Sequence, residues 1–264
     1  MKQFEIRYAI FAALICLLFS MNAAAQDFSK SYEIGQGGSI SVRNISGGVK
    51  VTGYEGESVL VLGFKEGRDR DLVTVEDNSA GNKVDVRAHY PENCDCNASI
   101  RFEVKVPLLA YKFETISSVS GDVEVTGVRG DLRAKSVSGA VTVRGVAGAV
   151  NASSTSGDVH VLEINGAVSG KSTSGNVEVE ITQLSGAGDM EFASTSGDVH
   201  VKIPANLDAD VRMSTFSGGL KTDFPLNIEE PEHGPGHRAS GRVGGGLRNL
   251  KLSSTSGSVS LMSM

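Results

Sequence analysis

Apolar and polar residues alternate in short blocks, and in the middle of the chain these blocks repeat every nine residues. Apolar side chains stand two, four and seven places after a glycine, as in Val123, Val125 and Val128 after Gly121. The step from two to four is the alternation of a β-strand. The step from four to seven breaks that parity, so the chain must turn a corner if all three side chains are to face one core. The same spacing predicts further inward positions at Leu132, Ala134, Val137, Val141, Val143, Val146, Val159, Val161 and Ile164.

Glycines mark the corners of this pattern. A Ser-Gly pair recurs every 18 residues at Ser120-Gly121, Ser138-Gly139, Ser156-Gly157 and Ser174-Gly175, with Gly130, Gly148 and Gly166 halfway between. Glycine and serine suit tight corners. The spacing starts upstream at Gly38, Gly47 and Gly56, and the motif returns after insertions at Gly188, Gly197, Gly218 and Gly257. A fixed period of this kind predicts a repeat architecture.

The full coil has 18 residues, because the two nine-residue halves differ in side-chain size at the fourth place. Large residues in one half alternate with small ones in the other: Val125, Val143, Val161 and Val179 against Ala134, Ala152 and Gly170. A large wall facing a small one fills a thin core. We therefore predict an all-β, single-stranded parallel β-solenoid of about 18–22 residues per coil, with rungs about 4.8 Å apart. We expect right-handed winding, as in other parallel crossovers.

A left-handed hexapeptide helix is the rival with the same coil length. It would place an aliphatic residue every six positions, but counting from Val123 gives Arg129 and Lys135. Two charged residues on an inward column exclude it.

Two regions depart from the regular coil. Residues 26–110 contain longer alternating segments, which we interpret as an N-terminal coil followed by wider β structure that caps the solenoid. Residues 111–264 form the regular solenoid, with an excursion at 224–246, rich in Gly and Pro, that predicts a hairpin or loop leaving the stack.

Residues 1–25 have the pattern of a secretory signal peptide. Lys2 and Arg7 precede an apolar run at 8–19, and Ala23-Ala24-Ala25 offers a small-residue cleavage site before Gln26. The run is shorter than the ~20 residues of a spanning helix, so no transmembrane segment is expected after cleavage. We predict an exported protein, periplasmic, at the cell surface or secreted.

The repeated (Val/Thr)-Ser-Gly-Asp-Val-x-Val motif, the segment Phe216–Leu226 and the closing Gly244–Val259 carry a family resemblance. The chain resembles the bacterial putative-adhesin family of unknown function over roughly residues 38–264, most strongly after Tyr111. The resemblance implies an extracytoplasmic β-helix, with some members associated with envelope stress or surface attachment. It brings no catalytic residues.

Composition agrees with a narrow core, since the chain has 32 Gly, no Trp and 6% aromatic residues. Its net charge is −6, and removing Lys2, Glu5 and Arg7 with the leader takes away a net +1, leaving −7. An acidic chain repels phosphate backbones, so nucleic acid is not an expected partner.

Candidate metal sites are sparse. Cys94 and Cys96 lie two residues apart, and in an oxidising compartment we expect a local disulfide between them. His89 would add a third ligand, but a structural zinc site needs four. The pair His233 and His237 likewise lacks a second pair nearby. We interpret Asp122, Asp131, Asp158, Asp189 and Asp198 as solvated turn residues rather than calcium ligands, because the Gly-Gly-x-Gly-x-Asp repeat is missing.

Catalytic signals are also missing. The recurrent Ser-Thr-Ser runs show no positioned base and acid, so they indicate a hydroxyl ladder at the corners. The sequence therefore predicts no cofactor, no metal and no catalytic residue.

The outward residues instead predict a binding face. It comprises Glu124, Thr142, Arg144, His160, Glu178, Glu180, His200 and Lys202, whereas the opposite wall carries smaller residues such as Asn151, Ser153, Ala167 and Ser169. We predict a non-enzymatic envelope or surface module that presents this face to a protein, glycan or envelope component. One alternative is a scaffold that self-associates through its end rungs. A less favoured alternative is a carbohydrate-active enzyme.

Overall fold

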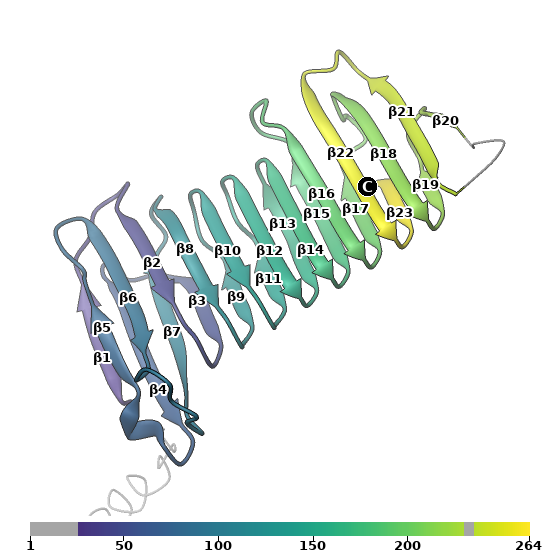
Figure 1. Cartoon of the computed structure of the whole chain (residues 1–264). Helices are drawn as coiled ribbons and strands as arrows, with labels where there is room; N and C mark the ends of the chain where they lie inside the picture. Colours follow the sequence, from purple (N-terminus) through teal and green to yellow (C-terminus); the bar gives the residue numbers. More distant parts are fainter. Residues whose placement is uncertain (1–25, 230–234) are drawn as a thin grey trace, which may run out of the picture.

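The chain winds into an elongated stack of coils whose strands form two long sheets facing each other (Figure 1). The computed structural model describes residues 26–229 and 235–264. The predicted signal peptide at 1–25 and His233 lie outside the described residues. A single 3-10 turn, η1 (Arg70–Leu72), interrupts the strands and loops of the described part. The predicted all-β solenoid is confirmed, and its handedness stays a prediction.

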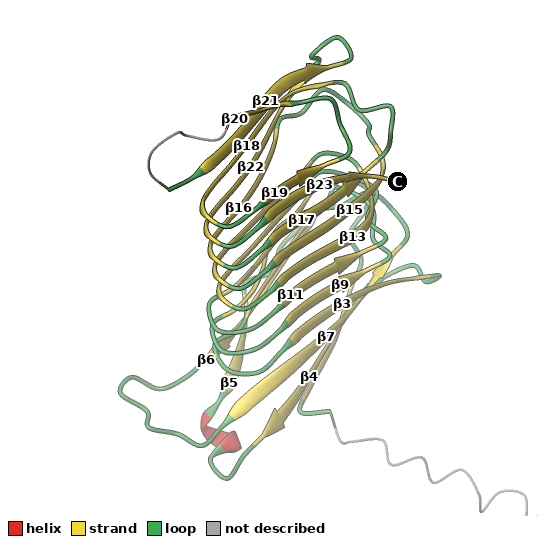
Figure 2. Ribbon diagram, turned by 90° about the vertical axis from the view of Figure 1, so that its right-hand side faces the viewer, coloured by secondary structure: helices red, strands yellow, loops and turns green. Residues whose placement is uncertain are grey.

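Sheet A has eleven strands, which Figure 2 shows as steps of a ladder. In stacking order they are β1 (Phe28–Tyr32), β4 (Val59–Glu66), β7 (Ser99–Pro107), β3 (Val49–Tyr54), β9 (Val123–Thr126), β11 (Val141–Arg144), β13 (Val159–Asn165), β15 (Val177–Gln183), β17 (Val199–Ile203), β23 (Val259–Ser263) and β19 (Leu220–Thr222).

Sheet B has twelve strands and forms the opposite wall. In the same direction along the stack they are β5 (Thr74–Asp77), β6 (Lys83–His89), β2 (Ser39–Arg43), β8 (Lys112–Ser118), β10 (Leu132–Ser136), β12 (Val150–Ser156), β14 (Val168–Ser174), β16 (Met190–Ser196), β22 (Arg248–Ser256), β18 (Ala209–Ser217), β21 (His237–Val243) and β20 (Asn227–Glu229).

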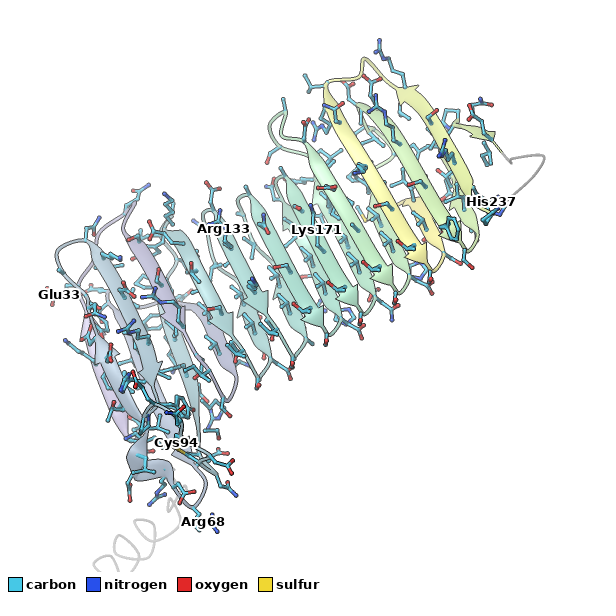
Figure 3. The ribbon with its side chains drawn as sticks, viewed as in Figure 1. Glu33, Arg68, Cys94, Arg133, Lys171 and His237 are labelled. Carbon is cyan, nitrogen blue, oxygen red and sulfur yellow. A yellow bond between two sulfur atoms is a disulfide. The ribbon has the colours of Figure 1, made fainter. Side chains whose placement is uncertain are left out.

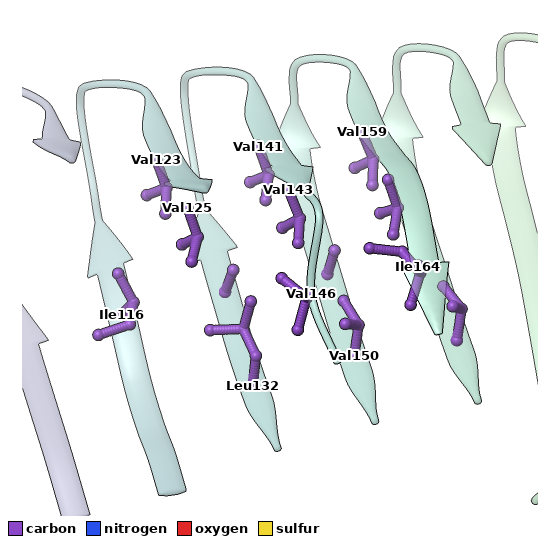
Figure 4. Close-up of a cluster of buried hydrophobic side chains, with 14 of the residues drawn as sticks. Ile116, Val123, Val125, Leu132, Val141, Val143, Val146, Val150, Val159 and Ile164 are labelled. Atoms are coloured by element: carbon purple, nitrogen blue, oxygen red, sulfur yellow. The ribbon is translucent and has the colours of Figure 1, made fainter. Parts of the chain in front are cut away.

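The 18-residue coil follows from the pairing of parallel strands in the middle of the stack. Val141 pairs with Val123 on one side and with Val159 on the other, and Val159 pairs with Val177. Successive nine-residue halves enter opposite sheets, so apolar side chains from both walls meet in one core (Figure 4). This core is continuous along the stack, which means that each coil is held by the one before and the one after it.

The corner predicted between the fourth and seventh places exists in the sheet A halves. Val128, Val146 and Ile164 are all buried. Just before them the chain adopts positive φ, +67° at Gly127, +63° at Gly145 and +58° at Glu163. This left-handed turn redirects the backbone so that the seventh residue faces the core.

The sheet B halves do not turn at this place, so the inward assignment of Val137 is wrong. Val137 is 36% exposed, and Ser136 beside it is fully buried. The strand simply continues its alternation through Leu132, Ala134 and Ser136. The two halves share a sequence spacing but differ in backbone path.

The buried serines of sheet B form a ladder inside the stack. The Ser136 hydroxyl donates to the carbonyl oxygen of Gly121 at 2.9 Å, and Ser154 donates to Gly139 at 2.8 Å. The series includes Ser118, Ser172, Ser194, Ser254 and Thr215, each bonded to a corner glycine of the neighbouring coil. In the coil β2–β3, Asn44 takes this role, donating to the Ile100 carbonyl of the neighbouring coil. The predicted hydroxyl ladder therefore exists, and its members lie inside the corners.

Glycines are needed at the corners because successive coils touch there. A Cβ atom on Gly157 would lie 2.2 Å from the carbonyl oxygen of Gly139, and one on Gly139 would lie 2.4 Å from that of Gly121. A second stack at the other edge of the coil has the same property, with 2.1 Å at Gly166. No side chain fits at such distances.

Chain order and stacking order differ at both ends. The coil β2–β3 lies between β6–β7 and β8–β9, and the last coil, β22–β23, lies between β16–β17 and β18–β19. Antiparallel strands cover the ends: β1 and β4 on sheet A, β5 on β6, and the β20–β21 pair on β18. These additions keep most strand edges of the regular coils from solvent.

Candidate binding faces

The eight residues of the predicted face all lie on the outer side of sheet A. Register places Glu124, Thr142, His160, Glu178 and His200 in one column across β9, β11, β13, β15 and β17. Arg144, Glu180 and Lys202 lie two residues further along their strands; Glu180 pairs with Lys202, whereas Leu162 of β13 separates Arg144 from Glu180. The structure therefore brings these side chains together as neighbours on successive coils.

Charges on this sheet A face largely neutralise one another. Glu124 accepts from the Nζ of Lys50 at 3.0 Å, and His160 Nδ1 lies 3.1 Å from Glu178 Oε2. Arg144 donates to Glu163 at 2.6 Å. His200 Nδ1 lies 2.7 Å from the Ser260 hydroxyl, and its Nε2 lies 3.8 Å from an oxygen of Asp198. Exposed pairs of this kind contribute about 0–1 kcal/mol each, so they leave a nearly neutral, solvated stripe.

The outer side of sheet B has a different charge. We call its outward residues on β10, β12, β14, β16 and β22 the basic face: Arg133, Lys135, Asn151, Ser153, Ser169, Lys171, Glu191, Ala193, Asn249, Lys251 and Ser253. Its cations are Arg133, Lys135, Lys171 and Lys251, and its one carboxylate is Glu191. Arg133 and Lys171 stand on the same sheet in Figure 3.

Glu191 is shared between two lysines. Lys171 donates to one of its oxygens, and the Nζ of Lys251 lies 3.2 Å from the other. The hydrogen bond from Lys171, with a further one from Lys251, holds the pKa of the Glu191 carboxyl below its usual range, although partial burial opposes this. Arg133 and Lys135 form no ion pair with any described residue, which leaves the face with an excess of positive charge.

Three hollows open on this side of sheet B. One of about 570 Å³ is lined in part by Arg133, Asn151 and Ser169, and also by the acidic residues Glu114, Asp131 and Asp189. A second, of about 480 Å³, lies over β10 to β22 and is lined in part by Lys135, Ser153, Lys171, Ala193 and Ser253. A third shares Ser253 and Thr255 with it and continues towards Arg238. None of these linings includes a residue of the predicted sheet A face.

Small side chains produce these hollows. In the column Lys135, Ser153, Lys171, Ala193 and Ser253, long and short residues alternate before a run of short ones. The small residues of this wall, which favoured sheet A as the predicted binding face, are therefore what opens the hollows on sheet B. The signal that could have located this face is Arg133-Ala134-Lys135 followed by Lys171 on equivalent repeats.

A column of exposed β-branched residues borders the basic face. It runs from Val119 and Val137 to threonines on the following coils, and its members are Val119, Val137, Thr155, Thr173, Thr195 and Thr255. Four of them contribute methyl and hydroxyl groups in register. They lie directly outside the buried serine ladder.

The aspartates at the turns have a structural role that sequence reasoning missed. Asp122 accepts the backbone N–H of Ala140 at 2.8 Å, and Asp158 accepts that of Asn176 at 2.7 Å. Asp131, Asp189 and Asp198 each accept an amide of the next coil as well. The hydrogen bond from Asn249 holds the pKa of Asp189 below its usual range. These side chains link coils, so describing them as merely solvated turn residues was incomplete.

The remaining candidates stay apart from both faces. Cys94 and Cys96 have Cα atoms 5.1 Å apart, which is within the range of a disulfide, and the bond stays a prediction. His89 contacts Glu76 at 3.0 Å. Within the described part of the chain, no three His, Cys, Asp or Glu residues group as metal ligands, and no helix is long and apolar enough to cross a membrane. His237 is described, whereas His233 is not.

The family model for Toastrack DUF4097 matches residues 35–262. The chain belongs to this family. The Toastrack match spans the solenoid from the first coil to the last strand, which agrees with the resemblance found from the repeats. The function of the Toastrack DUF4097 family is unknown.

Two solved structures are similar to this chain at low sequence identity. A "putative adhesin" from Bacteroides fragilis NCTC 9343 is 13% identical with a TM-score of 0.42, and 90% of this chain and 96% of that one are covered. A "putative cell adhesion protein" from Clostridium sporogenes ATCC 15579 is 8% identical with a TM-score of 0.30, covering 90% and 99%. No curated protein matches this Toastrack chain.

Proposed function

We propose that the protein is an exported, non-enzymatic binding module that presents a rigid solenoid face to a protein, glycan or other envelope component. The observation that carries this proposal is the register of outward side chains on successive coils, fixed by one continuous core and by the serine ladder. Such a surface offers contacts at a fixed spacing to a long partner, and several weak contacts together give avidity. The adhesin-like descriptions of the structural neighbours are consistent with this role.

An unbiased capture from envelope extract tests the proposal, with the folded protein as bait and the heat-unfolded protein as control. We expect partners that only the folded bait retains. An identical partner list from both baits would contradict the proposal. A glycan-degradation screen with the same preparation tests the enzymatic alternative. We expect no degradation product.

The contribution of the sheet A face can be tested in the same capture. Replacing His160, Glu178 and His200 together by Ser should leave the melting temperature nearly unchanged, because these side chains lie outside the core. Loss of captured partners would assign binding to the sheet A face. An unchanged list of partners would show that this face is not the binding surface.

End-to-end assembly has weaker support. The outermost strands are short: β1 has five residues, β5 four, and β19 and β20 three each. Short edge strands are a common device against edge-to-edge pairing. Light scattering during size exclusion tests this alternative. We expect a monomer, whereas end-to-end assembly would give larger species.

A further inference from the structure

We propose that the basic face of sheet B binds an acidic polysaccharide lying along the stack. This inference rests on the proposed binding function and names the partner class and the face. It differs from the sequence prediction, which placed binding on sheet A.

Charge distribution is the first observation. The whole chain carries a net charge of −6, and the outer side of sheet A is balanced by its own ion pairs. The basic face nevertheless carries four cations against Glu191 alone, and Arg133 and Lys135 are exposed and without an ion pair among described residues. On an acidic protein, a local positive surface attracts anions to that face, while the negative charge elsewhere repels them.

Spacing is the second observation. Lys135 and Lys171 lie in one column with Ser153 between them, so they are two coils, or about 10 Å, apart. The spacing between neighbouring coils is comparable to the length of one hexose unit in an extended polysaccharide. An extended polymer that bears a carboxylate or another anionic group on every sugar, or on every second sugar, would therefore meet this column in register.

The floor of the hollow is the third observation. Between the lysines lie small polar side chains, and hydroxyl groups of Ser153, Thr155 and Thr173 face the same space. These groups donate and accept hydrogen bonds and can replace water around sugar hydroxyls. The lining of this hollow has no aromatic ring, which disfavours the stacking used for nucleobases and for neutral sugar faces. A charged glycan fits this combination better than nucleic acid.

The test uses the purified protein and immobilised polygalacturonate, a polymer with one carboxylate per sugar, with neutral dextran as the reference. We expect binding to polygalacturonate that weakens as salt is raised, and no binding to dextran. Lys135→Ser with Lys171→Ser should weaken binding by about tenfold, because two charge-assisted contacts are removed.

The matched control removes two lysines from sheet A. Lys105 and Lys221 are exposed on β7 and β19, outside the predicted sheet A binding face, so Lys105→Ser with Lys221→Ser changes the net charge equally. We expect less than about a twofold effect from this control, since its lysines are on the other face. Circular dichroism and thermal melting should show both variants folded.

Equal weakening in both double variants would overturn the inference, because only net charge would then matter. Equal binding of dextran, or tighter binding of single-stranded DNA than of polygalacturonate, would overturn it too. If the envelope capture retains partners while polygalacturonate does not bind, this inference fails and the proposed function stands. If both experiments fail, the proposed function falls as well.

Discussion

The two halves of each coil have the same nine-residue spacing and differ in what closes their strands. In the sheet A halves, a left-handed residue at Gly127, Gly145 or Glu163 turns the chain and buries the seventh residue. In the sheet B halves, the strand runs straight and ends at a buried serine bonded to a glycine carbonyl. One half closes the core with apolar surface and the other with hydrogen bonds. A sequence period therefore fixes where strands recur, while the corner conformation decides which side chains point inward.

The largest expected effect comes from the corner that joins the two halves. Gly157→Ala would place a Cβ atom 2.2 Å from the carbonyl oxygen of Gly139. Because backbone must move to relieve this contact, we expect the free energy of unfolding to fall by about 3 kcal/mol. Urea unfolding followed by circular dichroism measures it. Gly219→Ala is the control, since its nearest neighbour would lie 4.0 Å away, and an equal loss there would contradict the explanation.

The next effect tests the small wall of sheet B. A Cβ atom on Gly170 would already lie 3.2 Å from Val177 and 3.5 Å from the ring of Phe192. Gly170→Val should therefore overpack the core and lower the free energy of unfolding by about 2 kcal/mol. Thermal melting of the variant beside the parent checks this. An unchanged melting temperature would mean that the small wall has spare volume.

The serine ladder separates the two halves more directly. Ser154→Ala removes a buried hydroxyl that donates to Gly139, and we expect a loss of about 1 kcal/mol. Ser153→Ala on the same strand changes an outward residue and should be nearly neutral. Chemical denaturation of the two variants compares them. Equal stabilities would remove the ladder as a source of stability.

The smallest effect concerns the left-handed corner of sheet A. Glu163 has φ +58°, where its equivalents Gly127 and Gly145 are glycines. Glu163→Gly should relieve this conformation and raise the free energy of unfolding by less than about 1 kcal/mol, after the loss of its exposed pair with Arg144. Arg144→Ser isolates the pair. A destabilisation by Glu163→Gly as large as that by Arg144→Ser would show no relief.

Sequence alone was sufficient for the coil, because Gly and Val recur in register at every rung and only parallel stacking places Val123, Val141 and Val159 together. It could not place Val137, since the turn that buries Val128 depends on φ at Gly127, and the sheet B half has no such turn. Nor could it locate the basic face. Small residues form a hollow only beside long side chains on adjacent coils, and the sequence does not show which residues are adjacent there.

The interleaved ends were also beyond reach. Residues 215–218 and 254–257 have closely similar motifs, so periodicity does not say which coil contacts β16. Pairing decides in favour of β22, with Ser194 beside Ser254. The repeat is compatible with either stacking order. The chain forms β18–β19 at the outer end of the stack, continues through the hairpin β20–β21, and then returns to place β22 between β16 and β18.

This return has a consequence for how the solenoid folds and how it resists force. The coil β22–β23 follows the coils β16–β17 and β18–β19 in the chain, yet it lies between them in the stack. The solenoid cannot form by adding rungs in chain order, since β22 must pair with both β16 and β18. We expect this long-range step to be late and slow. Tension applied to β23 would likewise load two ladders of backbone hydrogen bonds together, because β23 pairs with both β17 and β19.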